Sequence, residues 1–379
     1  MLAPYLAELL TQPRKMLNFI RKLRIARTRY GRPYRDLLAR FFDLLLNAHF
    51  TPRQIFLGDM LGIDREDLLR STISKTDLLR IQQALNPAMA VVLTEDKAIF
   101  SGYCRARNLP APHLLLAVGR RLAWTAEGTI LTGADQLISF LDRMPDSDIV
   151  IKPTHGAHGR GIRFLSHRGG CWSDEAGRIV TAREILQAVR EDREFSDFVI
   201  QERVRPHPEL ARLSGTDYLQ TARIITVVSE GAGAEVAFGA MKLIGGSATT
   251  DNVDAGSKGN MVGEISLSTG RLNWVRAPRP DGVGIMEATR HPVTGAVLPG
   301  FQLPFWPETL DLARRAAMAF LPLVTIGWDV AITPDGPLLI EGNAWWDPPI
   351  LVPFMESFRA HARPLLKQPA ALSQHVEGR

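Results

Sequence analysis

The sequence has 379 residues, enough for two or three domains with substantial cores, and its hydrophobic (45%) and charged (22%) fractions are typical of an ordinary soluble protein. Its two cysteines, Cys104 and Cys171, lack the spacing of a metal site and indicate a reducing, cytoplasmic environment. No apolar run approaches the roughly 20 residues that cross a bilayer, and the first positive charges follow an apolar stretch, which is not the order of a signal peptide.

The positive charge is concentrated near the N-terminus. Residues 1–50 hold ten Lys or Arg and three Asp or Glu, a net charge of +7, whereas the whole chain carries +5. Residues 14–35 contain nine basic residues and no acid, with apolar residues at helical spacing between them. The pattern predicts a basic amphipathic helix.

Such a helix has three interpretations. It covers a core with a solvated outer face, lies on an anionic membrane surface, or binds nucleic acid. No RNA-binding motif or interleaved aromatic pattern accompanies it, so we expect no nucleic-acid partner. The first two interpretations stay open, and a membrane role would place the protein at the inner face of the membrane.

More helices are expected after this one. Residues 36–50 predict a second helix, which Thr51 and Pro52 would end. Short helical pieces should follow, with Asp64 and Ser74 as caps. Residues 1–93 are therefore expected to form a basic helical region without obvious chemistry.

The pattern changes after residue 93. Thr94 is a candidate N-cap of a helix that runs to about residue 108. A strand is expected over residues 113–118 and a helix over residues 134–144. Strands, antiparallel hairpins and helices then alternate, which is typical of an α+β domain.

A glycine-rich loop lies between two predicted strands. Residues 149–153 form an apolar strand that carries Lys152, residues 154–161 include three glycines, and residues 162–166 form the next strand. Such a loop lays backbone N–H groups over phosphates, although no Gly-Lys-Ser/Thr ending or following helix makes it a Walker P-loop. The alternative is a tight structural hairpin. Because a lysine near the end of an apolar strand needs an anion or solvent, Lys152 favours phosphate binding.

Further strands are expected over residues 198–204, 221–229 and 236–244. The first turns polar at its end, the second contains Arg223 and the third contains Lys242. The polar, glycine-rich loop at residues 249–260 is long enough to suggest a function. Residues 276–306 show few periodic signals, and residues 307–321 predict an amphipathic helix that begins with proline.

Residues 326–347 read as two apolar strands around a turn. If the hairpin folds about Asp335, Asp329 lies opposite Glu341, and Asn343 points to the same face. The apolar residues expected to face the other way are Val330, Ile332, Leu338 and Ile340. Two carboxylates and an amide suit a hard cation such as Mg²⁺. The alternative is a pair of strand-end acids bonded to Trp and backbone groups.

In chain order, the motifs are a strand with a lysine, a glycine loop, a strand ending in Gln-Glu, a strand with an arginine, a loop with an asparagine, a helix, and finally Asp followed by Glu-x-Asn. This order resembles the ATP-grasp superfamily over about residues 95–350. The Asp-Asn-x-x-Ala-Gly loop at residues 251–256 is similar to that of the sugar-transfer-associated ATP-grasp branch.

The resemblance implies an α+β, ATP-grasp fold in which two α+β subdomains clasp ATP. The ATP-grasp domain would span residues 94–350, with a hinge near residues 201–204, after the helical region at residues 1–93. Residues 351–379 would form a C-terminal helix and tail.

The resemblance also implies roles for individual residues. Those that would bind the nucleotide are Lys97, Lys152, His158, Gly159, Gly161, Gln201, Glu202, Val204 and Glu209. Those that would face the transferred phosphoryl group or the acceptor are Arg223, Asn252 and Asp254. Those that would hold two Mg²⁺ ions, with Mn²⁺ as an alternative, are Asp329, Glu341 and Asn343. For Lys97 the alternative is a solvated lysine in a first helical turn, and for Lys152 it is a structural salt bridge.

The implied activity is that of an ATP- and Mg²⁺-dependent ligase that joins a small-molecule carboxylate to an amine, or to another nucleophile, through an acyl phosphate. The branch resemblance links this activity to cell-surface glycan or polysaccharide biosynthesis. The alternatives are an ATP-grasp kinase that phosphorylates a small molecule and a non-catalytic nucleotide-binding protein at the membrane surface.

Overall fold

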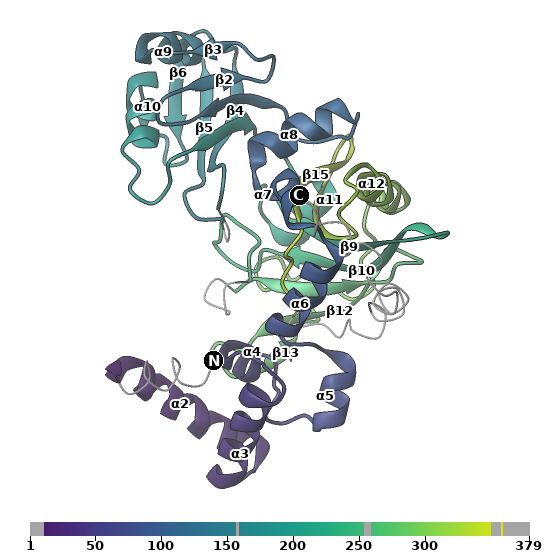
Figure 1. Cartoon of the computed structure of the whole chain (residues 1–379). Coiled ribbons are helices and arrows are strands. Elements are labelled where there is room, and N and C mark those ends of the chain that lie inside the picture. The colour runs from purple at the N-terminus through teal and green to yellow at the C-terminus, as the bar shows by residue number, and fades with distance from the viewer. Residues whose placement is uncertain (1–10, 157–158, 254–258, 350–357, 359–379) are drawn as a thin grey trace, which may run out of the picture.

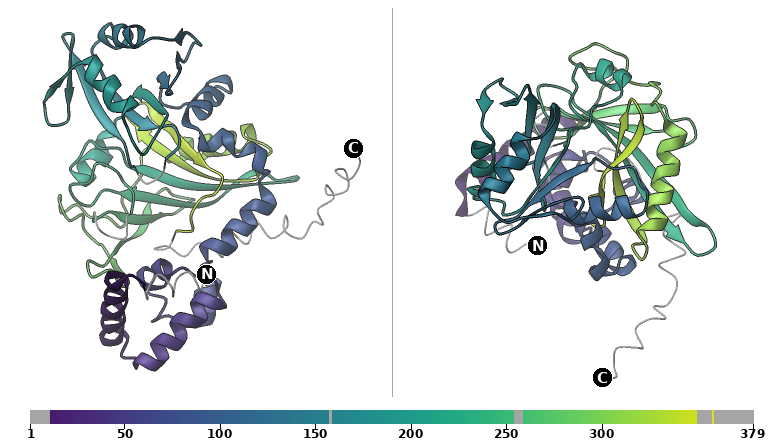
Figure 2. Two further views of the ribbon diagram at one scale, coloured as in Figure 1. Left: turned by 60° about the vertical axis from the view of Figure 1, so that its left-hand side comes forward. Right: turned by 90° about the horizontal axis from the view of Figure 1, so that it is seen from above.

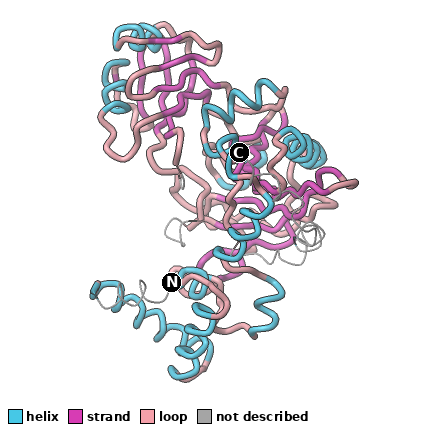
Figure 3. Tube along the Cα trace, viewed as in Figure 1, coloured by secondary structure: helices cyan, strands magenta, loops and turns pink. Residues whose placement is uncertain are grey.

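The computed structural model describes residues 11–156, 159–253, 259–349 and 358. Figure 1 shows three tiers: N-terminal helices at the bottom, a seven-stranded sheet in the middle and an eight-stranded sheet at the top. The N-terminal tier consists of helices joined by loops in Figure 3, and strands dominate the other two. This arrangement confirms the expected α+β class and the helical N-terminal region.

The N-terminal helices are α2 (Pro13–Tyr30), α3 (Tyr34–Leu46), α4 (Pro52–Leu57), α5 (Arg65–Ser71), α6 (Lys75–Leu85), the 3₁₀ turn η1 (Ala88–Ala90) and α7 (Val92–Glu95). Asp64 and Ser74 cap α5 and α6, as predicted. The prediction that Thr51 and Pro52 end the second helix is wrong, because α3 stops at Leu46. Thr51 instead forms a capping box with Gln54 and starts α4, where the fixed φ of proline suits a first turn.

The basic helix α2 covers a core. Leu23 and Ala26 are buried against a cluster that includes Phe41 of α3 and, from much later in the chain, Val283. Arg29 also pairs with Asp281 at 2.5 Å. The inner face of α2 therefore has the structural role that was one of the alternatives, while its outer face is exposed.

Helix α6 connects this region to the sheets (Figure 2). Asn86, at its C-terminal end, accepts hydrogen bonds from the Val324 and Thr325 N–H groups and donates to the Thr325 and Ala344 carbonyls, at 2.8 to 3.1 Å. Gln82 donates to the Trp346 carbonyl at 2.8 Å. Both side chains are buried, so these bonds fix the helical region against the chain around the predicted metal site.

The prediction that Thr94 caps the next helix is wrong. Thr94 lies inside α7 and donates to the Val91 carbonyl. Asp96 is the N-cap of α8 (Lys97–Ala106), and its carboxylate accepts from the N–H groups of Ala98 and Ile99. Asp is as good a cap as Thr, and the two lie two residues apart, so the sequence alone did not distinguish them.

The eight-stranded sheet is antiparallel, in the order β3-β2-β1-β8-β4-β5-β6-β7. Its strands are β1 (Leu114–Val118), β2 (Ala123–Thr125), β3 (Ile130–Leu131), β4 (Ser147–Pro153), β5 (Arg163–Arg168), β6 (Cys171–Asp174), β7 (Ile179–Val180) and β8 (Phe198–Glu202). Helices α9 (Ala134–Asp142) and α10 (Ala182–Arg190) pack on it through one cluster of buried apolar side chains.

The seven-stranded sheet is also antiparallel, in the order β13-β12-β11-β10-β9-β14-β15. Its strands are β9 (Thr221–Ser229), β10 (Gly233–Leu243), β11 (Met261–Ile265), β12 (Leu272–Pro278), β13 (Ile285–Glu287), β14 (Thr325–Thr333) and β15 (Gly336–Asn343). Helix α11 (Pro208–Ser214) precedes it, and α12 (Trp306–Ala319) packs on it in the same cluster as α8. No helix in the described ranges is both long and apolar enough to cross a membrane.

Candidate functional site

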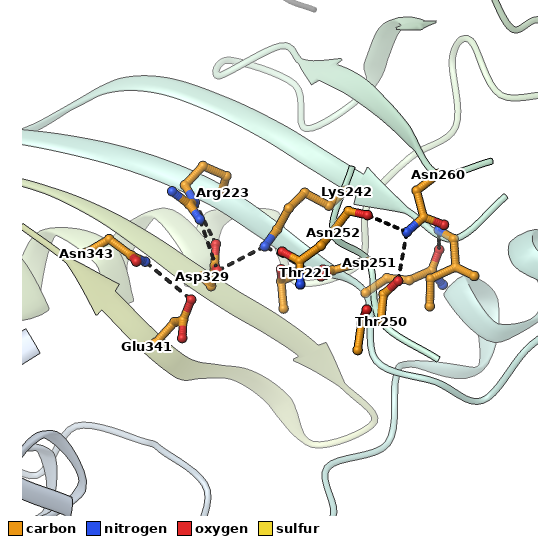
Figure 4. A network of polar contacts seen from close by, with 12 residues as sticks. Thr221, Arg223, Lys242, Thr250, Asp251, Asn252, Asn260, Asp329, Glu341 and Asn343 are labelled. Carbon is orange, nitrogen blue, oxygen red and sulfur yellow. Dashed lines mark hydrogen bonds and ion pairs between the residues drawn. The ribbon is translucent and has the colours of Figure 1, made fainter. Parts of the chain in front are cut away.

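A row of polar side chains crosses the second sheet. Arg223 of β9 is paired with Asp329 of β14, and Asp329 is paired with Glu341 of β15. Directly paired residues point to the same face of an antiparallel sheet, so the three side chains form one row (Figure 4). The predicted pairing of Asp329 with Glu341 is confirmed.

Two cations hold the Asp329 carboxylate. Arg223 Nε donates to Asp329 Oδ1 at 2.6 Å and Arg223 Nη2 to Oδ2 at 3.2 Å, while Lys242 Nζ donates to Oδ2 at 2.9 Å. The Asp329 side chain is only 6% exposed, so both cations offset the cost of burying its charge. Burial raises the pKa of Asp329, but the charges of Arg223 and Lys242 outweigh it and hold the pKa below its usual range.

The Glu341 carboxylate has no comparably close ion pair with a cation among the described residues. Its side chain is 30% exposed, and its nearest cation is Lys97, whose Nζ lies 4.0 Å from Oε2. Burial and then the charge of Asp329 raise the pKa of Glu341 above its usual range. Asn343 Nδ2 donates to the Gly327 carbonyl at 3.2 Å and approaches Glu341 Oε1 at 3.5 Å. A carboxylate in this position favours a further cation beside it.

The hairpin reaches this pairing through a bulge. The register shifts between Asp329, which pairs with Glu341, and Val330, which pairs with Leu339. Ile340 is therefore an extra residue on β15. It lines a cavity together with Glu341, so the prediction that Ile340 faces the opposite side is wrong.

Lys152 of β4 is a buried cation without an ion-pair partner among the described residues. It is 8% exposed. Burial, followed by the charge of Lys97, lowers its pKa to about 8, and the charge of Glu341 opposes this shift. The structural salt bridge considered as an alternative does not occur among the described residues. An anion beside this ammonium group would remove the penalty.

Lys152 lines a narrow cavity of about 170 Å³ between the two sheets. Two other lining side chains carry buried oxygen atoms without a hydrogen-bond partner in the described structure: Gln201 Oε1 and Thr250 Oγ1. Buried acceptors are nearly always satisfied in proteins. Their position in this wall indicates that a polar ligand supplies the missing partners.

The end of β8 and the segment that follows it form one wall of this cavity. Gln201, Glu202 and Val204 all line it, and their contact with a nucleotide stays a prediction. The Glu202 N–H donates to the His113 carbonyl at 3.1 Å, so this N–H is not left for a ligand. Glu209 lies in the first turn of α11 and is not among the residues that line this cavity.

The glycine loop covers the cavity from the first sheet. Gly159 lines it with φ of +72°, and a Cβ atom there would lie 2.8 Å from Thr250 Cγ2. Gly161 also has φ of +72°, and a Cβ atom there would lie 2.9 Å from Pro153 Cγ. Only glycine fits both positions without strain. His158 lies outside the described residues.

The loop after β10 lies at the same place. Asn252 lines the cavity, and its carbonyl accepts from Asn260 Nδ2 at 2.8 Å. Asp251 Oδ2 accepts from the Thr221 N–H at 2.8 Å and from its hydroxyl at 2.6 Å, which ties the loop to β9. Asp254 lies outside the described residues.

A wider cavity of about 620 Å³ adjoins the narrow one. Arg223 and Asn343 line the wider cavity only. The residues that line both cavities are Lys97, Gly156, Lys242, Asn252 and Glu341. The structure therefore brings together most of the predicted site residues at the junction of two cavities, with cations and a carboxylate between them.

Lys242 and Asp251 belong to this site, although the sequence analysis did not assign them to it. Lys242 Nζ lies 2.9 Å from Asp329 and 3.6 Å from Asp251 Oδ1. The sequence carried a signal for Lys242, since it is the one cation in the strand predicted over residues 236–244. The pairing of β10 with β9 brings Lys242 beside Asp329, and the sequence alone did not show which residues of the two strands pair.

The donor set fits Mg²⁺, which takes one or two carboxylates and completes its shell with water and phosphate oxygens. Within the described ranges, no group of three or more His, Cys, Asp or Glu side chains suits a metal ion. An ion here would therefore depend on Glu341, the Asn343 amide and the bound substrate. It would compete with Lys242 and Arg223 for Asp329.

The profile of the sugar-transfer associated ATP-grasp family matches residues 79–360. The chain belongs to this family. The ATP-grasp fold expected from the order of its motifs is thus confirmed, and the family region begins within α6, whose buried end bonds to the second sheet.

Solved structures with a similar arrangement include D-alanyl-alanine synthetase A from Vibrio cholerae (12% identity, 74% of this chain and 66% of that one, TM-score 0.41). Another is biotin carboxylase from Campylobacter jejuni (10% identity, 69% of this chain and 42% of that one, TM-score 0.41). A third is N5-carboxyaminoimidazole synthase from Aspergillus clavatus with ADP (11% identity, 77% of this chain and 58% of that one, TM-score 0.40). This family member spans between 42% and 66% of the lengths of these three proteins. A search among curated proteins found no match.

Proposed function

We propose that the protein is an ATP- and Mg²⁺-dependent ligase that joins a carboxylate to an amine through an acyl phosphate. The observation that carries the proposal is the junction of the two cavities at Lys97, Lys242 and Glu341. A nucleotide in the narrow cavity would present its terminal phosphate there, and the wider cavity would hold the acceptor. The name of the family supports a role in glycan biosynthesis.

The narrow cavity suits a nucleotide in its charge and its unpaired acceptors. Lys152 and Lys97 would bind the phosphates, and the buried Gln201 Oε1 would accept from the adenine amino group. Ile340 and Val204 would contact the faces of the base, with the Glu202 carbonyl near its edge. Lys152 and Gln201 Oε1 would each gain a partner that the described residues of the free protein do not supply.

Chemistry at the junction would consist of two displacements. A carboxylate oxygen of the acceptor attacks the γ-phosphorus while the bond to the β–γ bridging oxygen breaks, which releases ADP and leaves an acyl phosphate. An amine nitrogen then attacks the acyl carbon, phosphate leaves with its oxygen, and the nitrogen loses a proton. Lys97 and Lys242 would offset the negative charge that spreads over the phosphoryl oxygens.

When bound at Glu341 and Asn343, Mg²⁺ would neutralise the β- and γ-phosphates and orient them. The chain itself positions the reactants, because Asp329 and Asn343 are held by hydrogen bonds to neighbouring strands. The glycine loop between β4 and β5 would exclude water, which otherwise hydrolyses an acyl phosphate.

Trapping with hydroxylamine tests the acyl phosphate. We expect ATP, Mg²⁺ and a panel of carboxylic acids to give a hydroxamate and free phosphate when hydroxylamine replaces the amine. An ATP-grasp kinase would instead give a stable phosphorylated alcohol and no hydroxamate. That product would replace the ligase proposal with the kinase alternative.

Nucleotide binding is expected to take up protons at pH 8. Lys152 has a pKa of about 8 in the free protein, so a nearby triphosphate that raises this pKa would add roughly half a proton per site at pH 8, and little at pH 6.5. Calorimetric titration with a non-hydrolysable ATP analogue, in buffers of different ionisation enthalpy, measures this uptake. The Lys152→Arg variant, whose side chain stays charged, should show none; equal uptake in both proteins would contradict the assignment.

We also propose that the outer face of α2 binds an anionic lipid surface. Leu17 and Ile20 are 66% and 47% exposed on this helix. Arg14, Arg21 and Arg24 are exposed on the same helix, and no acid interrupts it. Exposed apolar side chains among cations match an interface of acyl chains and anionic headgroups.

Co-sedimentation with vesicles tests this surface. The protein should bind vesicles that contain phosphatidylserine, bind less at high salt, and bind pure phosphatidylcholine weakly. The double variant Leu17→Gln, Ile20→Gln should partition at least about tenfold less, since two exposed side chains no longer enter the acyl region. The control is Met89→Gln, which changes a residue that is 91% exposed elsewhere. Equal binding by both variants would remove α2 from the interface.

A further inference from the structure

The wider cavity is built partly by the N-terminal helical region. Its inner end is the junction with the narrow cavity, and its outer wall comes from α4, the start of α6 and the segment after β15. The lining residues from before the family region are Thr51, Arg53, Gln54, Leu57 and Lys75. Its volume of about 620 Å³ lies in the range of small-molecule sites.

The outer wall carries a positive charge at Arg53 that no carboxylate of the described residues pairs with. This exposed side chain donates from Nη2 to the Val253 carbonyl at 3.2 Å, next to Asn252 of the junction. No described carboxylate forms an ion pair with it. The neighbouring Lys75 differs, because its Nζ lies 2.6 Å from Asp347. One of the five N–H groups of the guanidinium makes this bond, so the other four can donate to an anion.

The surroundings of Arg53 add to this positive charge. Burial lowers the pKa of Lys22, and the charges of Arg21 and Arg53 lower it further, so the three cations lie close together. Lys22 Nζ lies over the Phe56 ring, 5.4 Å from its centroid, which fixes α2 against α4 here. The apolar part of the wall comes from Leu57, Trp345 and two prolines.

We infer that this cavity holds the acceptor, and that the acceptor carries a second anionic group that Arg53 binds, apart from the carboxylate that reacts at the junction. The identity of the reacting end rests on the proposed function. The inference of a second anion depends on the outer wall alone, where Arg53 has no carboxylate partner among the described residues and lines the 620 Å³ cavity. The N-terminal helices would thus select a dianionic acceptor with an apolar middle.

Binding measurements with dicarboxylates and monocarboxylates of matched length test this selection. Tryptophan fluorescence would follow titration of α,ω-dicarboxylates of increasing length, each against the monocarboxylate of equal length, with and without a saturating non-hydrolysable ATP analogue and Mg²⁺. For at least one length, the wild-type protein should bind the dicarboxylate at least tenfold more tightly. Arg53→Gln should abolish this preference, and Arg53→Lys should restore part of it.

The matched control is Arg80→Gln on α6, which removes an exposed arginine that pairs with Asp77 outside the cavity. It should keep the preference. A wild-type protein without preference at any length, or an Arg53→Gln variant that retains it, would overturn the inference. Failure of the ATP analogue to bind would instead refute the proposed nucleotide site, and the titrations without nucleotide would still decide the role of Arg53.

Discussion

The Glu341→Gln variant is expected to lose Mg²⁺-dependent ATP turnover by at least about 100-fold while it keeps its fold. Glu341 lies at the junction of the two cavities, and its one ion pair among the described residues is with Lys97, at 4.0 Å. Burial and the charge of Asp329 raise its pKa, so the neutral amide should cost the free protein no stability. The measurement is ADP release over a range of Mg²⁺ concentrations, with circular dichroism as the check on folding.

The control for this change is Glu287→Gln on β13. This exposed carboxylate belongs to the same sheet and lines neither cavity, so turnover should be unchanged. Asp329→Asn should also abolish turnover, but it breaks two ion pairs with partly buried cations and is therefore the less specific test. Full activity in the Glu341→Gln variant would refute the metal assignment.

The Lys152→Met variant is expected to bind nucleotide at least tenfold more weakly, about 1.4 kcal/mol, and yet to be more stable than the wild-type protein without nucleotide. Folding lowers the pKa of Lys152 from 10.5 to about 8 because the ammonium group is buried. That shift corresponds to a penalty of about 3 kcal/mol. Methionine has a similar length and carries no charge, so it removes the penalty together with the phosphate contact.

The stability gained by Lys152→Met is expected to depend on pH. The penalty is fully present below pH 8, where the buried side chain must be charged, and it fades as the pH rises towards 10.5, where the unfolded lysine also loses its proton. Denaturant unfolding should therefore show the largest gain for Lys152→Met at pH 7 and a smaller gain at pH 9.5. The exposed Lys15→Met is the control. Unchanged nucleotide affinity in Lys152→Met would remove Lys152 from the site.

Local sequence patterns predicted the parts of the site that depend on one hairpin or one loop. The turn predicted about Asp335 placed Asp329 opposite Glu341, as the structure shows, although the structure reaches this pairing through a bulge and not by unbroken alternation. Asp64 and Ser74 were recognised as caps because a cap acts on the next turn of its own helix. Lys152 stood out as a charge in an apolar strand.

Features that depend on distant segments could not be predicted in this way. Lys242 reaches Asp329 through the register of β10 on β9 and of β9 on β14, neither of which has a local signal. The bulge at Ile340 shifts one residue towards the cavity without a glycine to mark it. Arg53 meets Val253 across a separation of 200 residues, so the contribution of the helical region to the wider cavity was not visible in the sequence.

A crystal structure with a non-hydrolysable ATP analogue and Mg²⁺ tests the central claim most directly. We expect the adenine beside Gln201 and Val204, the phosphates between Lys152 and the Asp329–Glu341 pair, and metal density next to Glu341 and Asn343. A nucleotide bound elsewhere, or an empty cleft at saturating analogue concentration, would contradict the account.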